Sequence, residues 1–359
     1  MQTELTKTTW DRPLEEFPLE QYPDYREGEP PNLAELHKAS FLDEYSAIWG
    51  RPWGGCQGIG KLRDVGLVRA TEREENPLWT KDPKYFLLRF AQTIDASWLI
   101  ETQLAYAELL EQAGVTVHWL DIDDTVGAYG PMRKLFIAEE AMIIRGGAIL
   151  PRCGHGAYKR GLEREYQKFL TQLGCPILLS VHGAGIAEPS AMIVAVAENY
   201  WIAALSNSLN REGFDQILPV LMSHGGVEVH LTELPGIIDS FEAGGEFHLD
   251  MVVAPVDDRK ILVYPKHLNW PTYEWLKAKG FELIEIPEAE QRWAPANLTL
   301  LEPGVIVMHP QAAETTKKLQ AAGVEVIPFD WSGLMQGGVN GPRCCTLFLY
   351  REPGPTLDA

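Results

Sequence analysis

Cysteine is scarce in this chain, and the spacing of its cysteines excludes two common roles. The sequence has five of them in 359 residues: Cys56, Cys153, Cys175, Cys344 and Cys345. An odd, sparse set does not form the disulfide framework of a small secreted domain. No CxxC pair is present, which argues against a zinc ribbon or a thioredoxin-type redox pair. What remains for each cysteine is buried packing or a nucleophilic role.

Positive charge is also scarce. Lys and Arg number 31 against 50 Asp and Glu, and the formal net charge is −19. Such a surface repels nucleic acid and anionic membranes and attracts cationic substrates, although solubility alone would also explain it. No apolar stretch reaches the roughly 18 residues of a membrane span. The N-terminus lacks the basic and apolar regions of a secretory signal, so we expect a cytoplasmic protein without nucleic-acid or membrane partners.

The first 58 residues differ in composition from the rest. The stretch EEFPLEQYPDYREGEPPNL is rich in proline, acidic residues and tyrosine. It predicts an irregular arm that packs on the domain, with a short helix in NLAELHKASFLDEYSAIW. The expected organisation is an arm over residues 1–58 and a catalytic domain over residues 59–359.

From about residue 62 one pattern recurs: a helical stretch ends in glycine, and a short apolar strand follows. The instances are EQAGVTVHWL, TQLGCPILLS, SHGGVEVHLT, KAKGFELIEI and QAAGVEVIPF. Each glycine suits a helix C′ position, where a positive φ is needed. Strand pairs with hairpin turns precede most of these helices, as in AMIIRGGAILPR and MVVAPVDDRKILVYP. The repeating unit is therefore strand, strand, helix, strand.

Five such units at roughly 50-residue spacing predict an α/β fold in which five ββαβ blades surround a central channel. The first unit has one strand, LRDVGLVRA, before its helix, and CCTLFLYRE is left over after the fifth. The leftover strand would complete the first blade and close the ring. A generic α/β sheet is the alternative.

Residues that carry chemistry stand where blades begin. Cys344 follows the glycine-rich stretch GGVNGPR, whose backbone can approach a ligand closely. If the last strand starts at the cysteines, Cys344 and Cys345 point to opposite faces, so that one can face the channel while the other is buried. His248 and Asp250 precede the fourth blade and would share a face as an acid–base pair. Glu188 and Glu140 occupy the same place before the third and second blades. Taken singly, each residue could equally be packing or exposed.

The five-blade pattern, FHLD and GGVNGPRCCTLFLYRE together resemble the pentein superfamily of guanidine-modifying enzymes. That family includes arginine deiminases, dimethylarginine hydrolases, agmatine deiminases and amidinotransferases. The resemblance covers roughly residues 60–352. It implies Cys344 as the nucleophile, His248 as the catalytic histidine and Asp250 as a substrate-binding acid. Glu188 matches the first acid of the FEGxD-like loop and is expected to act in catalysis.

The chain departs from the family pattern at two acids. Ala191 replaces the second acid of the FEGxD-like loop, and Glu140 replaces an aspartate that binds the guanidine, with Glu139 in place of the arginine before it. The segment LSNSLNREG resembles a family segment that binds substrate, which makes Asn207 a candidate. Gly341 and Arg343 of the glycine-rich loop are candidate substrate-binding residues as well.

The implied reaction is hydrolysis of a guanidine C–N bond through a covalent thiouronium, without metal or organic cofactor. The two departures favour a small or substituted guanidine, such as methyl- or nitroguanidine, over free arginine. An amidinotransferase would use the same residues, and a non-catalytic pentein that binds another molecule is a more distant alternative. The metal motif of ureohydrolases, DxHxD, is absent. A homo-oligomer is possible.

Overall fold

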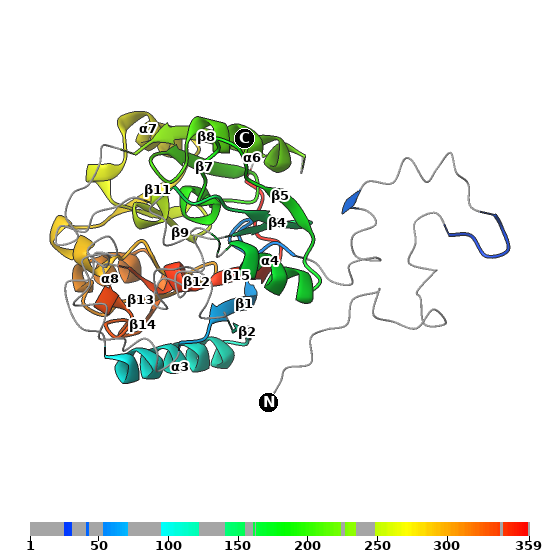
Figure 1. Cartoon of the computed structure of the whole chain (residues 1–359). Coiled ribbons are helices and arrows are strands. Elements are labelled where there is room, and N and C mark those ends of the chain that lie inside the picture. Colours follow the sequence, from blue (N-terminus) through cyan, green and yellow to red (C-terminus); the bar gives the residue numbers. More distant parts are fainter. Residues whose placement is uncertain are drawn as a thin grey trace.

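The five sheets of the computed structural model all have the same build, and Figure 1 shows how they are arranged. The model describes residues 25–30, 41–42, 53–70, 95–121, 141–154, 161, 163–223, 227–234, 248–337 and 340–357. Within these residues each sheet has three strands, of which the first two run antiparallel and the last two parallel. A helix crosses from the second strand to the third. The predicted ββαβ blade is thereby confirmed.

The first blade combines the two ends of the domain. Its strands are β15 (Leu347–Arg351), β1 (Leu62–Val68) and β2 (Thr116–Leu120), with α3 (Ala96–Gln112) before β2. Strand β15 pairs antiparallel with β1, as Val65 lies opposite Phe348. The leftover C-terminal strand thus closes the ring, as the repeat predicts.

The other four blades follow in chain order. The second has β3 (Met142–Ile144), β4 (Gly147–Leu150), α4 (Glu163–Gln172) and β5 (Ile177–Ser180); the third has β6 (Ile193–Ala195), β7 (Tyr200–Leu205), α6 (Arg211–Met222) and β8 (Glu228–Glu233). The fourth has β9 (Val253–Asp257), β10 (Lys260–Val263), α7 (Trp270–Ala278) and β11 (Glu282–Glu285); the fifth has β12 (Thr299–Glu302), β13 (Val305–Met308), α8 (Ala313–Ala321) and β14 (Glu325–Pro328).

Local sequence explains where these helices begin and end. Side chains of Asp95, Asn210 and Asn269 accept hydrogen bonds from main-chain N–H groups at the starts of α3, α6 and α7. The glycine after a helix has a positive φ in four of the five predicted places: Gly114, Gly174, Gly280 and Gly323. The fifth, Gly226, lies outside the described residues. The helices α3, α6, α7 and α8 lie on the periphery, with the strands toward the centre (Figure 1).

The core is formed by two clusters of buried apolar side chains. One gathers mainly residues of the third and fourth blades, such as Trp201, Ile202 and Leu262. The other gathers mainly residues of the first and second blades, such as Tyr106 and Phe348. None of the described helices is long and apolar enough to cross a membrane.

Short helices stand where the sequence predicts strand entrances. Residues Pro342–Cys345 form the 3-10 helix η14, and β15 begins only at Leu347. The predicted strand alternation of the two cysteines is therefore wrong, because proline at the first helical position favours a helical turn there. Likewise, Leu249–Met251 form the 3-10 helix η10, so His248 and Asp250 do not share the face of a strand.

Most of the predicted N-terminal arm, including most of its expected helix, falls outside the described residues. Its last residues pack onto β15: the Gly54 N–H donates to the Leu349 carbonyl, and Trp53 is buried. A boundary near residue 58 stays a prediction.

Candidate active site

A buried histidine–carboxylate pair joins the third and fourth blades. Glu188 precedes the four-residue helix α5 (Pro189–Met192), and His248 precedes η10. His248 Nε2 lies 2.9 Å from Glu188 Oε2. Glu188 has no exposed surface, and its N–H donates to the Ser208 carbonyl at 2.8 Å. A carboxylate held in this way fixes the orientation of the imidazole.

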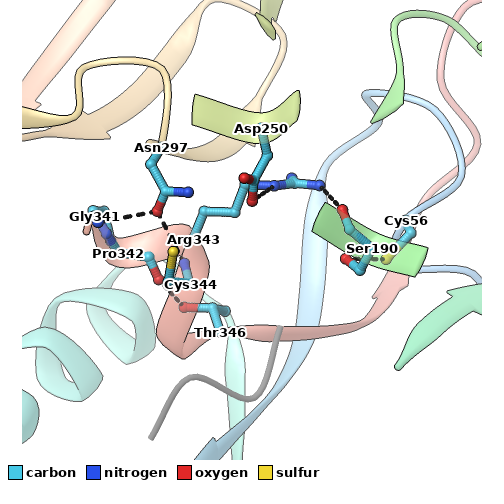
Figure 2. A network of polar contacts seen from close by, with 9 residues as sticks. All are labelled: Cys56, Ser190, Asp250, Asn297, Gly341, Pro342, Arg343, Cys344 and Thr346. Carbon is cyan, nitrogen blue, oxygen red and sulfur yellow. Dashed lines mark hydrogen bonds and ion pairs between the residues drawn. The ribbon is translucent and has the colours of Figure 1, made fainter. Parts of the chain in front are cut away.

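Asp250 is the second buried carboxylate of the site. It is 2% exposed, and its Oδ2 accepts a hydrogen bond from Arg343 Nε at 3.1 Å. Burial raises the pKa of the Asp250 carboxyl above its usual range, while Arg343 and His248 both act to lower it. The Asn297 amide, which faces Asp250 (Figure 2), also acts to lower the pKa of this carboxyl. A carboxylate in such a place gains much from a cationic ligand, since charge-assisted hydrogen bonds are strongest away from water.

Cys344 stands at a rigidly held turn. The amide oxygen of Asn297 accepts hydrogen bonds from the main-chain N–H groups of Gly341 at 3.1 Å and Cys344 at 3.0 Å. Asn297 is fully buried, so these bonds are not exchanged for water. Thr346 Oγ1 also donates to the Pro342 carbonyl at 2.7 Å. Figure 2 shows the Cys344 sulfur on the side of the turn that faces Asn297.

The neighbouring thiol, Cys345, is in a different environment. It is 1% exposed and close to Tyr106, whose hydroxyl lies within hydrogen-bond distance of Thr299 and Thr346. Burial raises the pKa of the Cys345 thiol well above its usual range. A thiol that stays protonated is a poor nucleophile.

Arg343 links the three short helices of the site. Its Nε donates to Asp250 in η10, and its Nη2 donates to the Ser190 carbonyl in α5 at 3.0 Å. Ser190 Oγ lies 3.5 Å from the Cys56 sulfur (Figure 2). Because Arg343 is next to Cys344, this arginine ties the segment of the cysteine to both carboxylate-bearing segments.

The structure brings together most of the site residues predicted from the sequence, but not all. Cys344, His248, Glu188, Asp250, Gly341 and Arg343 belong to the connected segments just described. Asn207 lies in an exposed turn after β7, apart from these segments as far as the hydrogen bonds of the described residues are concerned. Glu139 and Glu140 lie outside the described residues. Ala191 is buried within α5.

Asn297 and Ser190 are members of this network that the sequence analysis did not single out. A signal for Asn297 was available: it precedes β12, the first strand of the fifth blade, just as Glu188 and His248 precede the third and fourth. The described residues contain no group of three or more His, Cys, Asp or Glu side chains arranged to hold a metal ion.

Comparison with known proteins places this site in a family. The arginine deiminase family model matches residues 266–351. The N(G),N(G)-dimethylarginine dimethylaminohydrolase of Mycobacterium tuberculosis is 32% identical, over 75% of this chain and 84% of the relative. The chain belongs to the pentein superfamily. Like these relatives, it is an enzyme, a hydrolase that acts on C–N bonds.

Two further comparisons extend over more of this pentein. The 2-nitroimidazole nitrohydrolase of Mycobacterium sp. (strain JS330) is 29% identical over 99% of this chain and 97% of its own length. Among solved structures, the dimethylarginine dimethylaminohydrolase of Pseudomonas aeruginosa in complex with citrulline aligns with a TM-score of 0.62 at 18% identity, covering 81% of this chain and 100% of the other. At that identity the likeness concerns the fold: a five-bladed α/β propeller.

Proposed function

We propose that this pentein hydrolyses a C–N bond of a guanidine compound through a covalent intermediate on Cys344. The observation that carries the proposal is the buried network itself. Glu188 pairs with His248, and Arg343, next to Cys344, donates hydrogen bonds to Asp250 and to the Ser190 carbonyl in the short helices that follow His248 and Glu188. The family supports the same roles, because acids that bind a guanidinium and a cysteine that attacks it are its shared chemistry.

In the proposed reaction the carboxylates hold a planar guanidinium with its central carbon next to the Cys344 sulfur. The Cys344 thiol gives its proton to His248, and the resulting thiolate attacks that carbon to form an S–C bond and a tetrahedral intermediate. His248, which Glu188 orients, gives this proton to the departing nitrogen as the C–N bond breaks, and a thiouronium remains on Cys344. His248 then takes a proton from water, which attacks the same carbon and releases a urea compound and the free thiol.

The proposed substrate is a small or substituted guanidine, such as methylguanidine or nitroguanidine. Ala191 offers a buried methyl group where the family pattern has an acid, which removes one anchor for a larger cationic substrate. Glu140 is one methylene longer than the aspartate of the family pattern, and we propose that this extra length narrows the guanidine pocket. We propose that Gly341, Arg343 and Asn207 contribute to binding, Arg343 by orienting Asp250.

The 2-nitroimidazole nitrohydrolase, which matches 99% of this chain, suggests a second class of substrate. Its name specifies a 2-nitroimidazole, whose carbon 2 is bonded to three nitrogen atoms as the central carbon of a guanidine is. Attack of a thiolate at such a carbon would expel nitrite, an anion that leaves without a proton from His248. A nitro-substituted C–N bond therefore fits the same nucleophile with less need for the general acid.

A substrate panel tests the proposal. Purified enzyme is incubated with guanidine, methylguanidine, nitroguanidine, arginine and 2-nitroimidazole, and the release of ammonia, methylamine and nitrite is measured. We expect turnover of at least one small compound, a loss of about 10³-fold or more in Cys344→Ser, and nearly full activity in Cys345→Ser. Mass spectrometry of the quenched enzyme should show the adduct on the peptide that contains Cys344.

Three results would contradict parts of this proposal. Undiminished turnover in Cys344→Ser would refute the covalent mechanism. Arginine as the best substrate by a wide margin would refute the preference for small guanidines. Turnover that requires an added amine, with no ammonia release in water, would indicate an amidinotransferase.

A further inference from the structure

A cavity lies between the first strands of several blades, and Arg343 is one of the residues that line it. Its walls come from the first strands of the third, fourth and fifth blades, with Ala195, Ala254 and Leu300 among them. The arm contributes Gly55, Cys56 and Gly58. Two arginines, Arg343 and Arg351, complete the lining. We call this space the channel cavity. Cys344, His248 and Glu188 do not line it, and Arg343 is the residue that it shares with the candidate active site.

Arg351 is a buried cation without a carboxylate partner among the described residues. It is 6% exposed, and its Nε and Nη1 donate to the carbonyls of Gly55 and Gly60, each at 3.0 Å. Its guanidinium also lies 5.0 Å from the Phe348 ring. These neutral partners leave the charge uncompensated, and Nη2 donates no hydrogen bond within the part of the chain that the structure describes. Burial, followed by the charge of Arg343, lowers the pKa of Arg351 to about 9.

Arg343 adds a second positive charge to the same space. Its Nε and Nη2 are engaged with Asp250 and Ser190, and Nη1 has no hydrogen bond within the described residues. Asp250 balances one of the two arginine charges. Glu198 also approaches the edge of the cavity, at Gly58, but its carboxylate is engaged elsewhere. It accepts a hydrogen bond from the Gly354 N–H and lies 3.9 Å from Arg145. The two guanidinium groups and Asp250 together leave one positive charge in excess.

We infer that the channel cavity binds one small monovalent anion between Arg343 and Arg351. The charge excess calls for a single negative charge, because a buried unpaired cation is costly. The cavity measures about 30 Å³, more than the ~10–15 Å³ that one water-sized sphere requires. That space suits a halide or an ion the size of nitrite. The apolar walls disfavour larger, strongly hydrated anions such as sulfate or phosphate.

Such an anion would act on the active site through Arg343. This arginine contacts the cavity on one side and Asp250 on the other, so the anion and Asp250 share one guanidinium. An occupied cavity balances the charge of Arg351 and keeps Arg343 in place between η10 and α5. Anion binding should therefore raise both the stability of the fold and the catalytic rate, with the same midpoint concentration.

Crystals soaked in sodium bromide and measured at the bromine absorption edge test the site directly. We expect one anomalous peak in the channel cavity within about 3.5 Å of guanidinium nitrogens of both arginines. In solution, chloride replaces gluconate at constant ionic strength while the melting temperature is recorded. A saturable rise of about 2 °C is expected in the wild type.

Two variants separate anion binding from a general salt effect. Arg351→Gln removes the unpaired cation, and Ala254→Val fills the cavity while both arginines remain; each should abolish the saturable rise. Arg211→Gln, which alters an exposed arginine paired with Asp215, should retain it. The inference is overturned if the cavity shows no bromide peak, if it holds water or a carboxylate of the chain instead, or if Ala254→Val responds to chloride as the wild type does. None of these outcomes depends on which substrate the enzyme hydrolyses.

Discussion

One amide side chain, Asn297, fixes the position of the candidate nucleophile. Its Oδ1 accepts the N–H groups of Gly341 and Cys344, while its main-chain carbonyl accepts the N–H of Arg343 at 3.4 Å. The same residue faces Asp250 (Figure 2). A single side chain thus spans the distance between the nucleophile and the acid that is proposed to bind substrate, and small displacements in such a place are costly to the rate.

We therefore predict that Asn297→Ala lowers kcat by about 10²-fold, because the turn of Cys344 loses two hydrogen bonds. Asn297→Asp keeps the acceptor oxygen but places a second negative charge next to Asp250. It should retain more of kcat and change KM instead. Steady-state kinetics of both variants, with circular dichroism to verify folding, checks the prediction. Equal losses in the two variants, confined to KM, would contradict a positioning role.

For individual residues, the sequence predicts which side chains belong to the site better than it predicts what those side chains contact. Glu188, His248 and Asp250 were recognisable because each precedes a blade and carries a titratable side chain. Asn297 precedes a blade as well, but an amide carries no such signal and its two bonds depend on a turn more than 40 residues away in sequence. For the same reason the sequence predicts Arg343 only as a substrate-binding residue. Its contacts with Asp250 and Ser190 are known only from the structure.

Among the elements, the 3-10 helix η14 depends on a glycine at its start. A Cβ built on Gly341 would overlap the main-chain carbonyl oxygen of Asn297. We predict that Gly341→Ala lowers kcat at least tenfold by displacing the turn of Cys344. Gly323→Ala is the matched control, since Gly323 ends α8 at a φ of +83° with open space around it. That control should cost about 1–2 kcal/mol of stability and leave kcat unchanged.

The result would be read from kcat and unfolding midpoints measured on both glycine variants. A Gly341→Ala enzyme with normal kcat would show that the turn tolerates displacement and that its glycine serves another purpose.

A second element, the segment from β13 to α8, carries a buried histidine that should respond to pH. His309 is 3% exposed and stacks on Trp293 at 4.8 Å. Its Nδ1 accepts the Gln311 N–H at 3.2 Å, so the neutral ring carries its proton on Nε2, which lies 3.2 Å from Ser332 Oγ. Burial lowers the pKa of His309, although Asp330 acts to raise it.

The direction of the pH effect follows from this lowered pKa. Below about pH 6.5 the unfolded chain takes up a proton on His309 before the folded chain does. Stability should therefore fall as the pH drops below that value. We predict that His309→Gln has a smaller decrease in melting temperature between pH 7 and pH 5.5 than the wild type. His182→Gln, at an exposed histidine, should behave as the wild type, and equal slopes in all three proteins would exclude His309 as the cause.

At the scale of elements, the glycines after helices and the paired strands are the sequence features that predict the secondary structure reliably. The strand pairs, the crossing helices and the closing strand β15 follow from periodicity and turn residues, which are local properties. The short helices η10 and η14 did not follow, because a three- or four-residue helix leaves no periodic pattern. Pro342 offered the one local hint for η14, since proline suits the first position of a helix.

For the whole molecule, the ring explains why the site draws on distant parts of the chain. Glu188, His248, Asn297 and Cys344 come from segments before different blades, and closure by β15 against β1 brings the last of them to the others. The count of repeats was sufficient to predict this closure. The channel cavity was beyond sequence analysis, since the solitary charge of Arg351 shows only when its surroundings are known.

The formal net charge of −19 leads to a prediction for the molecule as a whole. Methylguanidine is a cation at pH 7, whereas nitroguanidine is neutral. A negative surface attracts a cation over distances set by the Debye length, about 30 Å at 0.01 M salt and about 8 Å at 0.15 M. If both compounds are substrates, raising the salt concentration across this range should lower kcat/KM several-fold for methylguanidine and leave it unchanged for nitroguanidine.

Sodium gluconate is the salt to use, because chloride would also fill the proposed anion site. The comparison of two substrates on one enzyme preparation removes any effect of salt on stability. An equal decrease for both substrates would mean that salt acts on the enzyme rather than on the approach of the cation, and the large negative charge would then serve solubility alone.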